Sequence, residues 1–121
     1  MSVQSFRDLD VWKLAMDLVV MVYKHSGRFP KEETYGLTNQ VRRATVSIPS
    51  NIAEGQGRRS TKEFLNHLSI ARGSLMEMQT QIEIAKRLLF LKPEAAEEIL
   101  QFSGSVARLL NALMNALERK L

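Results

Sequence analysis

The sequence STKEFLNHLSIARGSLMEMQTQIEIAKRLLFL, residues 60–91, decides the fold of this chain. Its apolar side chains recur at alternating steps of four and three residues, which is the heptad spacing of a helix that buries one face against other helices. These side chains are Phe64, Leu68, Ala71, Leu75, Met78, Ile82, Ala85 and Leu89. The spacing predicts one long helix from about residue 60 to 91.

The flanks of this stretch fit helix boundaries. Ser60 and Glu63 have the spacing of a capping box, in which the hydroxyl and the carboxylate bond to backbone amides of the first turn. At the other flank, Pro93 suits the first position of a new helix and disfavours helical geometry at Lys92. We therefore predict a last helix from about residue 93 to 120. Its apolar face consists of Ala96, Ile99, Ser103, Val106, Leu110, Leu113 and Leu117.

Two more helices are expected in the N-terminal half, at about residues 8–27 and 33–54. The first has two adjacent apolar stripes, which predicts that it packs against two neighbours. These stripes are Leu9, Trp12, Met16, Val19 and Tyr23, and beside them Val11, Ala15, Leu18 and Val22. The second carries Leu37, Val41, Ala44, Ile48 and Ile52 at helical spacing. Pro49 lies inside it, so we expect a kink, with the hydroxyl of Thr45 or Ser47 bonding a freed carbonyl.

The helices and their short connections define the fold class. No stretch alternates polar and apolar residues in the manner of a strand, so the chain is predicted to be all-α. A length of 121 residues suffices for one hydrophobic core. We therefore expect a single domain over residues 1–121, folded as an antiparallel, up-and-down four-helix bundle.

Composition excludes several classes of protein. The chain contains no cysteine, which rules out disulfides, thiolate catalysis and cysteine-ligated metal centres. The Glu-x-x-His pairs of di-metal bundles are also missing, so we expect no metal and no cofactor. The first residues do not resemble a signal peptide, and no apolar run is long enough to span a bilayer. We expect a soluble cytoplasmic protein with no membrane partner.

The net charge of +4 is concentrated in one segment. Residues 36–62 contain a single acidic residue, Glu54, whereas the rest of the chain is balanced in charge. The basic residues of this segment are Arg42, Arg43, Arg58, Arg59 and Lys62. Because guanidinium groups pair with phosphate through parallel hydrogen bonds, these five are candidate nucleic-acid-binding residues. The alternative is ordinary solvation, or pairing with Glu54, Glu77 and neighbouring chains.

A polar cluster is expected between the second and third helices. Asn51 and Glu54 are one turn apart, and Ser74 and Glu77 have the same spacing. We interpret these four residues as a hydrogen-bond network that fixes the register of the helices, with Arg42 or Arg72 as a further partner. No histidine or metal-binding pattern lies beside them in the sequence to complete a catalytic mechanism, so we expect no catalytic residue and no enzymatic activity.

The histidines and methionines are given structural roles. His67 is expected to pair with Glu63 on the surface, and His25 to interact with the negative end of the first helix. The methionines on or beside apolar stripes are expected to pack in the core. They are Met16, Met21, Met76, Met78 and Met114.

Several ordered motifs resemble one known family, the four-helix bundle proteins associated with 23S rRNA intervening sequences. The resemblance covers roughly residues 6–91, and the last helix matches only in its hydrophobic pattern. The motifs are Phe6-x-x-Leu9-x-Val11-Trp12, Phe29-Pro30-x-x-Glu33-x-Tyr35-Gly36-Leu37-Thr38-x-Gln40, Ser47-Ile48-x-Ser50-Asn51-Ile52-Ala53-Glu54-Gly55, Gly73-Ser74-x-x-Glu77 and Thr80-Gln81-x-x-Ile84-Ala85.

The resemblance implies more than the residues alone. It implies a bacterial protein that assembles as a homopentamer with a central channel, in a family whose biochemical role is poorly defined. The chain is also similar to the accessory protein of diversity-generating retroelements, a pentamer that binds nucleic acid and a reverse transcriptase. Together with the basic segment, this favours an oligomeric, non-enzymatic protein that binds RNA or DNA. The alternative is a self-assembling scaffold that binds a protein partner.

Overall fold

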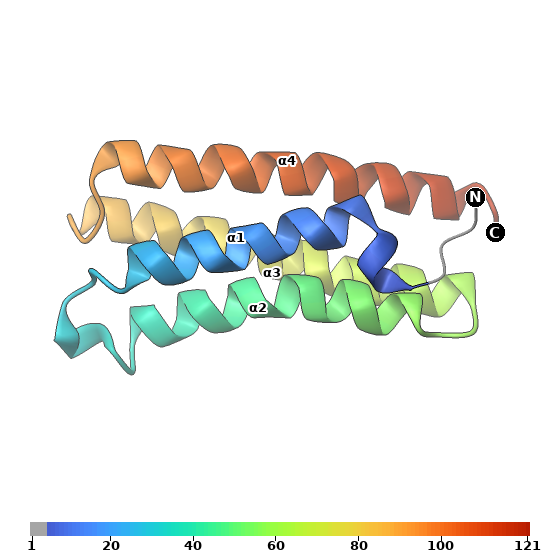
Figure 1. Cartoon of the computed structure of the whole chain (residues 1–121), viewed down its shortest axis with the longest axis horizontal. Helices are drawn as coiled ribbons and strands as arrows, with labels where there is room; N and C mark the ends of the chain where they lie inside the picture. The colour runs from blue at the N-terminus through green and yellow to red at the C-terminus, as the bar shows by residue number, and fades with distance from the viewer. Residues whose placement is uncertain (1–4) are drawn as a thin grey trace.

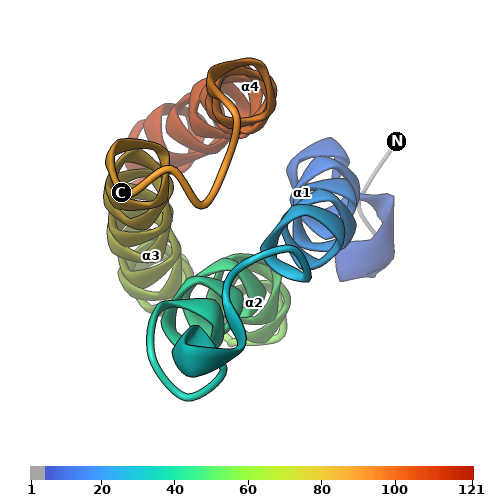
Figure 2. The same ribbon diagram turned by 90° about the vertical axis from the view of Figure 1, so that its left-hand side faces the viewer.

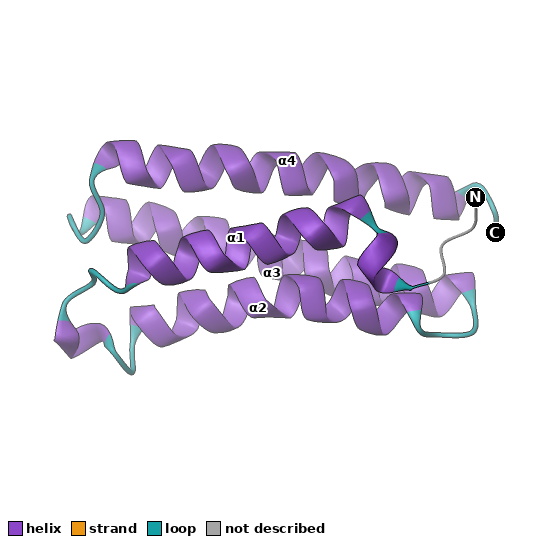
Figure 3. Cartoon of the chain, viewed as in Figure 1, coloured by secondary structure: helices purple, strands orange, loops and turns teal. Residues whose placement is uncertain are grey.

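The computed structural model describes residues 5–121, and over this range every regular element is helical (Figures 1 and 3). The α-helices are α1 (Asp10–Ser26), α2 (Leu37–Gln56), α3 (Thr61–Arg87) and α4 (Pro93–Glu118). Two short 3-10 helices, η1 (Phe6–Asp8) and η2 (Lys31–Glu33), precede α1 and α2. Within residues 5–121 there are thus four α-helices and no strand, which confirms the all-α class predicted from the sequence.

The four helices of the described range form a ring of neighbours. α2 contacts α1 and α3, and α4 contacts α3 and α1, whereas α1 and α3 lie diagonally opposite one another (Figure 2). The prediction that the first helix has two neighbours is confirmed. The loops that join successive helices lie at alternate ends of the bundle (Figure 1).

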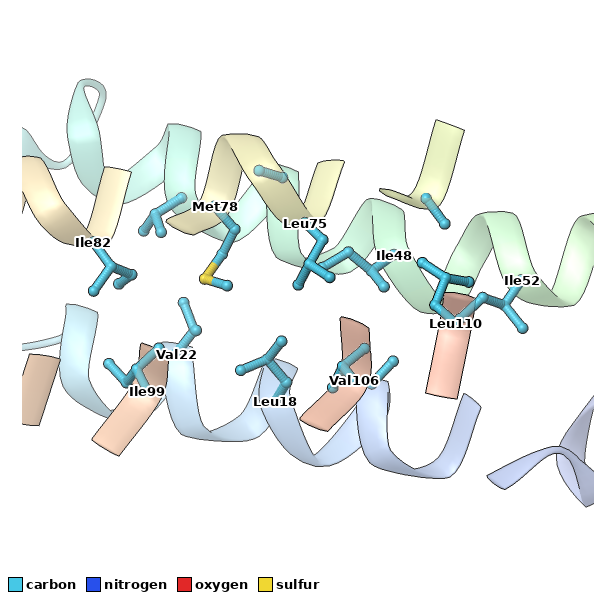
Figure 4. Close-up of a cluster of buried hydrophobic side chains, with 14 of the residues drawn as sticks. Leu18, Val22, Ile48, Ile52, Leu75, Met78, Ile82, Ile99, Val106 and Leu110 are labelled. Atoms are coloured by element: carbon cyan, nitrogen blue, oxygen red, sulfur yellow. The ribbon is translucent and has the colours of Figure 1, made fainter. Parts of the chain in front are cut away.

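The core runs along the inside of this ring. Leu18 of α1, Ile48 of α2, Leu75 of α3 and Leu110 of α4 are fully buried and face one another (Figure 4). Burying one such side chain contributes roughly 1.5–3 kcal/mol to the free energy of folding. The heptad positions of α3 from Leu68 to Ala85 all lie in this core, as their spacing predicted.

The end of α3 differs from its prediction. The helix stops at Arg87 rather than near residue 91, because Leu89 adopts the left-handed conformation with φ of 63°. The Leu89 N–H donates to the Lys86 carbonyl (3.1 Å) and the Phe90 N–H to the Ala85 carbonyl (2.9 Å). This is a Schellman motif with leucine where glycine is usual.

The turn after α3 directs one aromatic side chain, Phe90, and one aliphatic side chain, Leu91, toward the interior of the protein. The ring of Phe90 packs against Phe29 with centroids 5.8 Å apart, and Leu91 is buried. Leu89, by contrast, is 85% exposed. Leu89 thus continues the heptad spacing of the sequence but does not lie in the core. The helix ends before it, because Phe90 and Leu91 pack into the interior.

The start of α2 is later than predicted. α2 begins at Leu37 rather than near residue 33, because η2 and Gly36 precede it. Gly36 has no side chain to cap the helix, and the Glu33 carboxylate accepts the Leu37 N–H instead (3.0 Å). The remaining bounds, Asp10–Ser26 and Pro93–Glu118, lie within two residues of the predicted ones. As predicted, Pro93 is at the first turn of α4.

Pro49 lies inside α2, which continues through it to Gln56. The carbonyl that loses its usual partner is that of Thr45. The Thr45 hydroxyl donates to the Val41 carbonyl (2.6 Å), and the Ser47 hydroxyl bonds Ser74 (2.9 Å). The expectation that one of these hydroxyls bonds the freed carbonyl was therefore wrong, because each has a partner elsewhere.

The C-terminal turn of α2 approaches α3 very closely at Gly55. A Cβ atom at Gly55 would lie 2.7 Å from the Cβ of His67 and 2.9 Å from Cδ1 of Phe64. Both are shorter than a van der Waals contact, so only glycine fits between the two helices at this point.

We predict that Gly55→Ala destabilises the protein by about 1–3 kcal/mol, because overpacking outweighs the helix propensity of alanine. Gly73→Ala is the matched control, since a Cβ at Gly73 on α3 meets nothing within 4 Å. The control should stabilise α3 by about 0.5–1 kcal/mol. Urea denaturation of both variants measures the difference, and equal effects of the two substitutions would contradict the close approach.

Candidate nucleic-acid interface

The five candidate basic residues fall into two clusters. Arg42 and Arg43 lie in the second turn of α2, whereas Arg58, Arg59 and Lys62 surround the turn between α2 and α3. At 1.5 Å per residue, Arg43 and the end of α2 at Gln56 are separated by about 20 Å along the helix axis. Within one chain the five residues form two separate sites, which we call the α2 cluster and the turn cluster.

Arg42 is held by the end of α1. Its Nε donates to the Ser26 hydroxyl (2.8 Å) and its Nη2 to the Tyr23 carbonyl (3.2 Å). The guanidinium carbon also lies 4.5 Å from the centroid of the Tyr23 ring. A cation at this end of α1 is favourable because the last carbonyls carry partial negative charge. Arg42 thus makes side-chain contacts with the C-terminal turn of α1, where the sequence suggested His25.

Arg43 is free, unlike its neighbour. Its side chain is exposed and makes no hydrogen bond or ion pair with any residue of the described range 5–121. It lines two adjacent cavities. One, of about 510 Å³, is open to solvent and is bounded by Tyr23, Thr34, Thr38, Asn39, Arg42, Arg43, Val46 and Ser47. The other, of about 280 Å³, is bounded by Gln40, Arg43, Ala44, Ser47, Ser74 and Glu77.

The turn cluster contains one paired and two unpaired cations. Arg58 Nη2 lies 3.2 Å from Glu54 Oε1 in an exposed ion pair, which contributes little to stability. Arg59 and Lys62 are exposed and have no side-chain partner among residues 5–121. Both can therefore approach an anion without breaking an existing contact.

The N-terminus of α3 is capped by a single side chain. The Ser60 hydroxyl accepts the Glu63 N–H (3.1 Å), as the capping box predicted. Across the described residues, the Ser60 amide donates no hydrogen bond to the Glu63 carboxylate, so only half of the expected box forms. A complete box occurs instead at η1, between Ser5 and Asp8.

A polar network joins α2 to α3. Asn51 Nδ2 donates to the carbonyl and hydroxyl of Ser47 (2.9 and 3.0 Å), and the Ser47 hydroxyl bonds Ser74 (2.9 Å). Asn51 Oδ1 lies 3.2 Å from His67 Nδ1, which also lies 3.8 Å from Glu54 Oε2. Three of the four residues expected in this cluster, Asn51, Ser74 and Glu54, belong to one network through Ser47 and His67.

Three residues in this region differ from the expectation. His67 contacts Asn51 and Glu54 on α2 rather than Glu63 on its own helix, because its ring turns toward the α2–α3 interface. Glu77 is outside the network, and its carboxylate accepts a long hydrogen bond from Gln81 (3.5 Å). Arg42, suggested as a further partner, is bound to α1 instead.

Most of the exposed apolar side chains of the helices lie on α1 and α3, which do not touch. On α1 they are Met16, Val20 and Tyr23, and on α3 they are Ile70, Met76 and Ile84, followed by Leu88 just after the helix. The prediction that Met16 and Met76 pack in the core was wrong, since they are 40% and 48% exposed, whereas Met78 is buried. A groove of about 360 Å³ between α1 and α2, which includes Trp12 and Pro49, adjoins the face on α1.

Metal-binding and membrane-spanning features were also sought. Over residues 5–121, no three or more histidine, aspartate or glutamate side chains gather as a metal site would require. No helix in that same range is both long and apolar enough to cross a bilayer.

The fold and the surface together define a small helical-bundle protein with unpaired cations and exposed apolar faces. Residues 7–112 match the model of the family described as 23S rRNA-intervening sequence protein, and the chain belongs to this family. The family expected from the sequence motifs is thus confirmed, and the match extends into α4.

The fold is also seen among solved structures, one of which is described by its source. It is a protein of unknown function from the S23 ribosomal protein family of Bacteroides thetaiotaomicron. It superposes with a TM-score of 0.77 at 24% sequence identity, covering 86% of this chain and 97% of that one. No curated protein matches the sequence.

We predict that Asn51→Ala destabilises the protein by about 1–3 kcal/mol, because Asn51 joins the Ser47 and His67 side chains across the α2–α3 interface. Asn66→Ala is the control, since Asn66 is exposed on α3, and its effect should stay within about 0.5 kcal/mol. Denaturant titration of both variants provides the measurement. Equal stability of the two variants would show that the network is not structural.

Proposed function

We propose that this chain is a non-enzymatic, oligomeric protein of the cytoplasm that binds RNA or DNA through its basic clusters. The observation that supports this most directly is the set of exposed, unpaired cations, Arg43, Arg59 and Lys62. A cation that stabilises no internal contact is available for an external phosphate. The description of the family, which refers to 23S rRNA, agrees with a nucleic-acid partner.

The separation of the two clusters bears on how a nucleic acid would bind. A distance of about 20 Å corresponds to roughly six phosphates along one strand of B-form DNA, at about 3.4 Å per phosphate. A ligand must therefore be several nucleotides long to contact the α2 cluster and the turn cluster of one chain together. Shorter ligands would contact one cluster only, with fewer counterions released.

The exposed apolar faces support self-assembly. In the proposed antiparallel, up-and-down bundle, the faces on α1 and α3 are on opposite sides of the chain. Contact between the α1 face of one copy and the α3 face of the next would cover both, and repetition of such a contact closes a ring. We propose that this ring is the homopentamer that the family resemblance implies, in which each basic cluster is repeated around the assembly.

The second candidate function is a self-assembling scaffold for a protein partner. The exposed apolar side chains of α3 favour it, because Ile84 and Leu88, one turn apart, are both exposed at the C-terminal end of that helix. In that role these apolar side chains, rather than the cations, would provide the main contact with the partner.

We predict that affinity for single-stranded RNA falls steeply with salt, because each neutralised phosphate releases a counterion. Arg43→Glu, Arg59→Glu and Lys62→Glu should each weaken binding and lower the slope of log affinity against log salt by about 1. Fluorescence anisotropy at several salt concentrations gives both quantities.

Arg108→Glu provides the matched control for these charge reversals. Arg108 is exposed on α4, which does not contact α2, and its substitution changes the net charge equally. It should leave the slope unchanged. Affinity that does not respond to salt, or an equal effect of Arg108→Glu, would sink the nucleic-acid proposal and favour the scaffold.

We predict that Val20→Lys on α1 and Ile84→Lys on α3 each convert the oligomer to monomer, because assembly would bury an unpaired charge. Light-scattering mass measures the outcome. Glu98→Lys is the control, since Glu98 is exposed on α4, and it should leave the mass unchanged. A monomeric parent protein at every concentration would rule out the proposed assembly.

A further inference from the structure

The 510 Å³ cavity has features of a ligand site beyond its contribution to surface charge. It lies where three segments meet: the last turn of α1, the residues after η2, and the first turns of α2. Its volume falls within the range of roughly 300–1,000 Å³ that is usual for small-ligand sites. The cavity is open to solvent, so the end of a chain can enter it from outside.

The lining of the cavity carries positive charge. Two guanidinium groups, those of Arg42 and Arg43, are among its lining residues, and no carboxylate is. The Glu33 carboxylate accepts the Leu37 N–H, and Glu77 lines only the adjacent cavity. Arg43 and Glu77 form no ion pair within 4 Å, although both border that second cavity.

The two arginines differ in a way that suits anion binding. Arg42 is fixed by its bonds to Ser26 and Tyr23, so its guanidinium is oriented before any ligand arrives. Arg43 has no partner among residues 5–121 and is free to close on a ligand. A preoriented cation beside a mobile one loses less conformational entropy on binding than two mobile cations would.

Uncharged donors surround these cations. Thr38 and Asn39 belong to the first turn of α2, where the backbone amides carry partial positive charge, and both residues line the cavity. The Leu37 amide is already occupied by Glu33, and the first amide to bond within the helix is that of Gln40. The amides of Thr38 and Asn39 make no hydrogen bond within residues 5–121, so they need give up no internal partner to bond a phosphate oxygen.

From this arrangement we infer that the cavity binds the terminal phosphate monoester of a nucleic-acid strand. A monoester carries nearly two negative charges near pH 7 and presents three acceptor oxygens, whereas an internal phosphodiester carries one charge. Two guanidinium groups and several neutral donors match the monoester in charge and in number of hydrogen bonds. The inference deepens the proposed function and rests on it, because it assigns the α2 cluster to the end of a strand and the turn cluster to internal phosphates.

The test compares one single-stranded RNA, long enough to reach both clusters, in three forms: with a 5′-phosphate, with a 3′-phosphate, and with hydroxyls at both ends. Anisotropy titration of the full chain should show about tenfold tighter binding of at least one phosphorylated form. Adenosine monophosphate and adenosine, titrated by calorimetry, distinguish a free nucleotide from a strand end. Binding of the monophosphate alone would place a free nucleotide in the cavity.

Two variants distinguish binding of the terminal phosphate in the cavity from general electrostatic attraction of RNA. Arg43→Gln should abolish the preference for the phosphorylated form, whereas Lys62→Gln should weaken all three RNAs equally and keep the preference. Neither side chain makes an internal bond within residues 5–121, so the melting temperatures of both variants should match that of the parent.

The remaining outcomes separate this inference from the proposed function. Equal affinity for the three RNA forms would overturn the terminal-phosphate site and leave nucleic-acid binding in place. No binding of any RNA, with binding of adenosine monophosphate lost in Arg43→Gln, would overturn nucleic-acid binding and keep the phosphate site. No binding of any of these ligands would overturn both.

Discussion

The close contact between α2 and α3 is the constraint on which the rest of the structure depends. Gly55 lets the two backbones approach at one end, and the Ser47–Ser74 and Asn51–His67 contacts fix their register farther along. This register sets which face of α2 looks outward, and therefore where Arg43 stands. Polar contacts specify the pairing more sharply than apolar side chains do, because a hydrogen bond tolerates little displacement whereas aliphatic contacts can slide.

The features that sequence predicted well are those that depend on near neighbours in the chain. The heptad from Leu68 to Ala85, the cap at Ser60 and the first-turn Pro93 each need only a few adjacent residues to be recognised. The end of α3 was misjudged because its cause is tertiary. Leu89 continues the heptad, yet packing of Phe90 against Phe29, far away in the sequence, reverses the chain before Leu89 can reach the core.

The candidate site was predicted less completely, for a related reason. Arg42 and Arg43 are the same residue type at neighbouring positions, so the sequence does not distinguish their roles. Their side chains lie on different faces of α2: Arg42 contacts Tyr23 and Ser26, whereas Arg43 is exposed to solvent. Likewise, Ser47 and His67 join the polar network through contacts between residues that are 16 to 27 positions apart. The cavity was not predicted at all, because its lining comes from three segments whose meeting point depends on the path of the loop after α1.

Arg42 also ties the two N-terminal helices together through contacts that are local in the sequence. Because its guanidinium bonds the last turn of α1, the end of α1 and the first turns of α2 are held against one another. The partners are 16 and 19 residues apart, so the loop to be closed is short and the entropy cost of closing it is small. Both sides of this contact belong to the α1–α2 hairpin, so the arginine fastens that hairpin without any residue of α3 or α4.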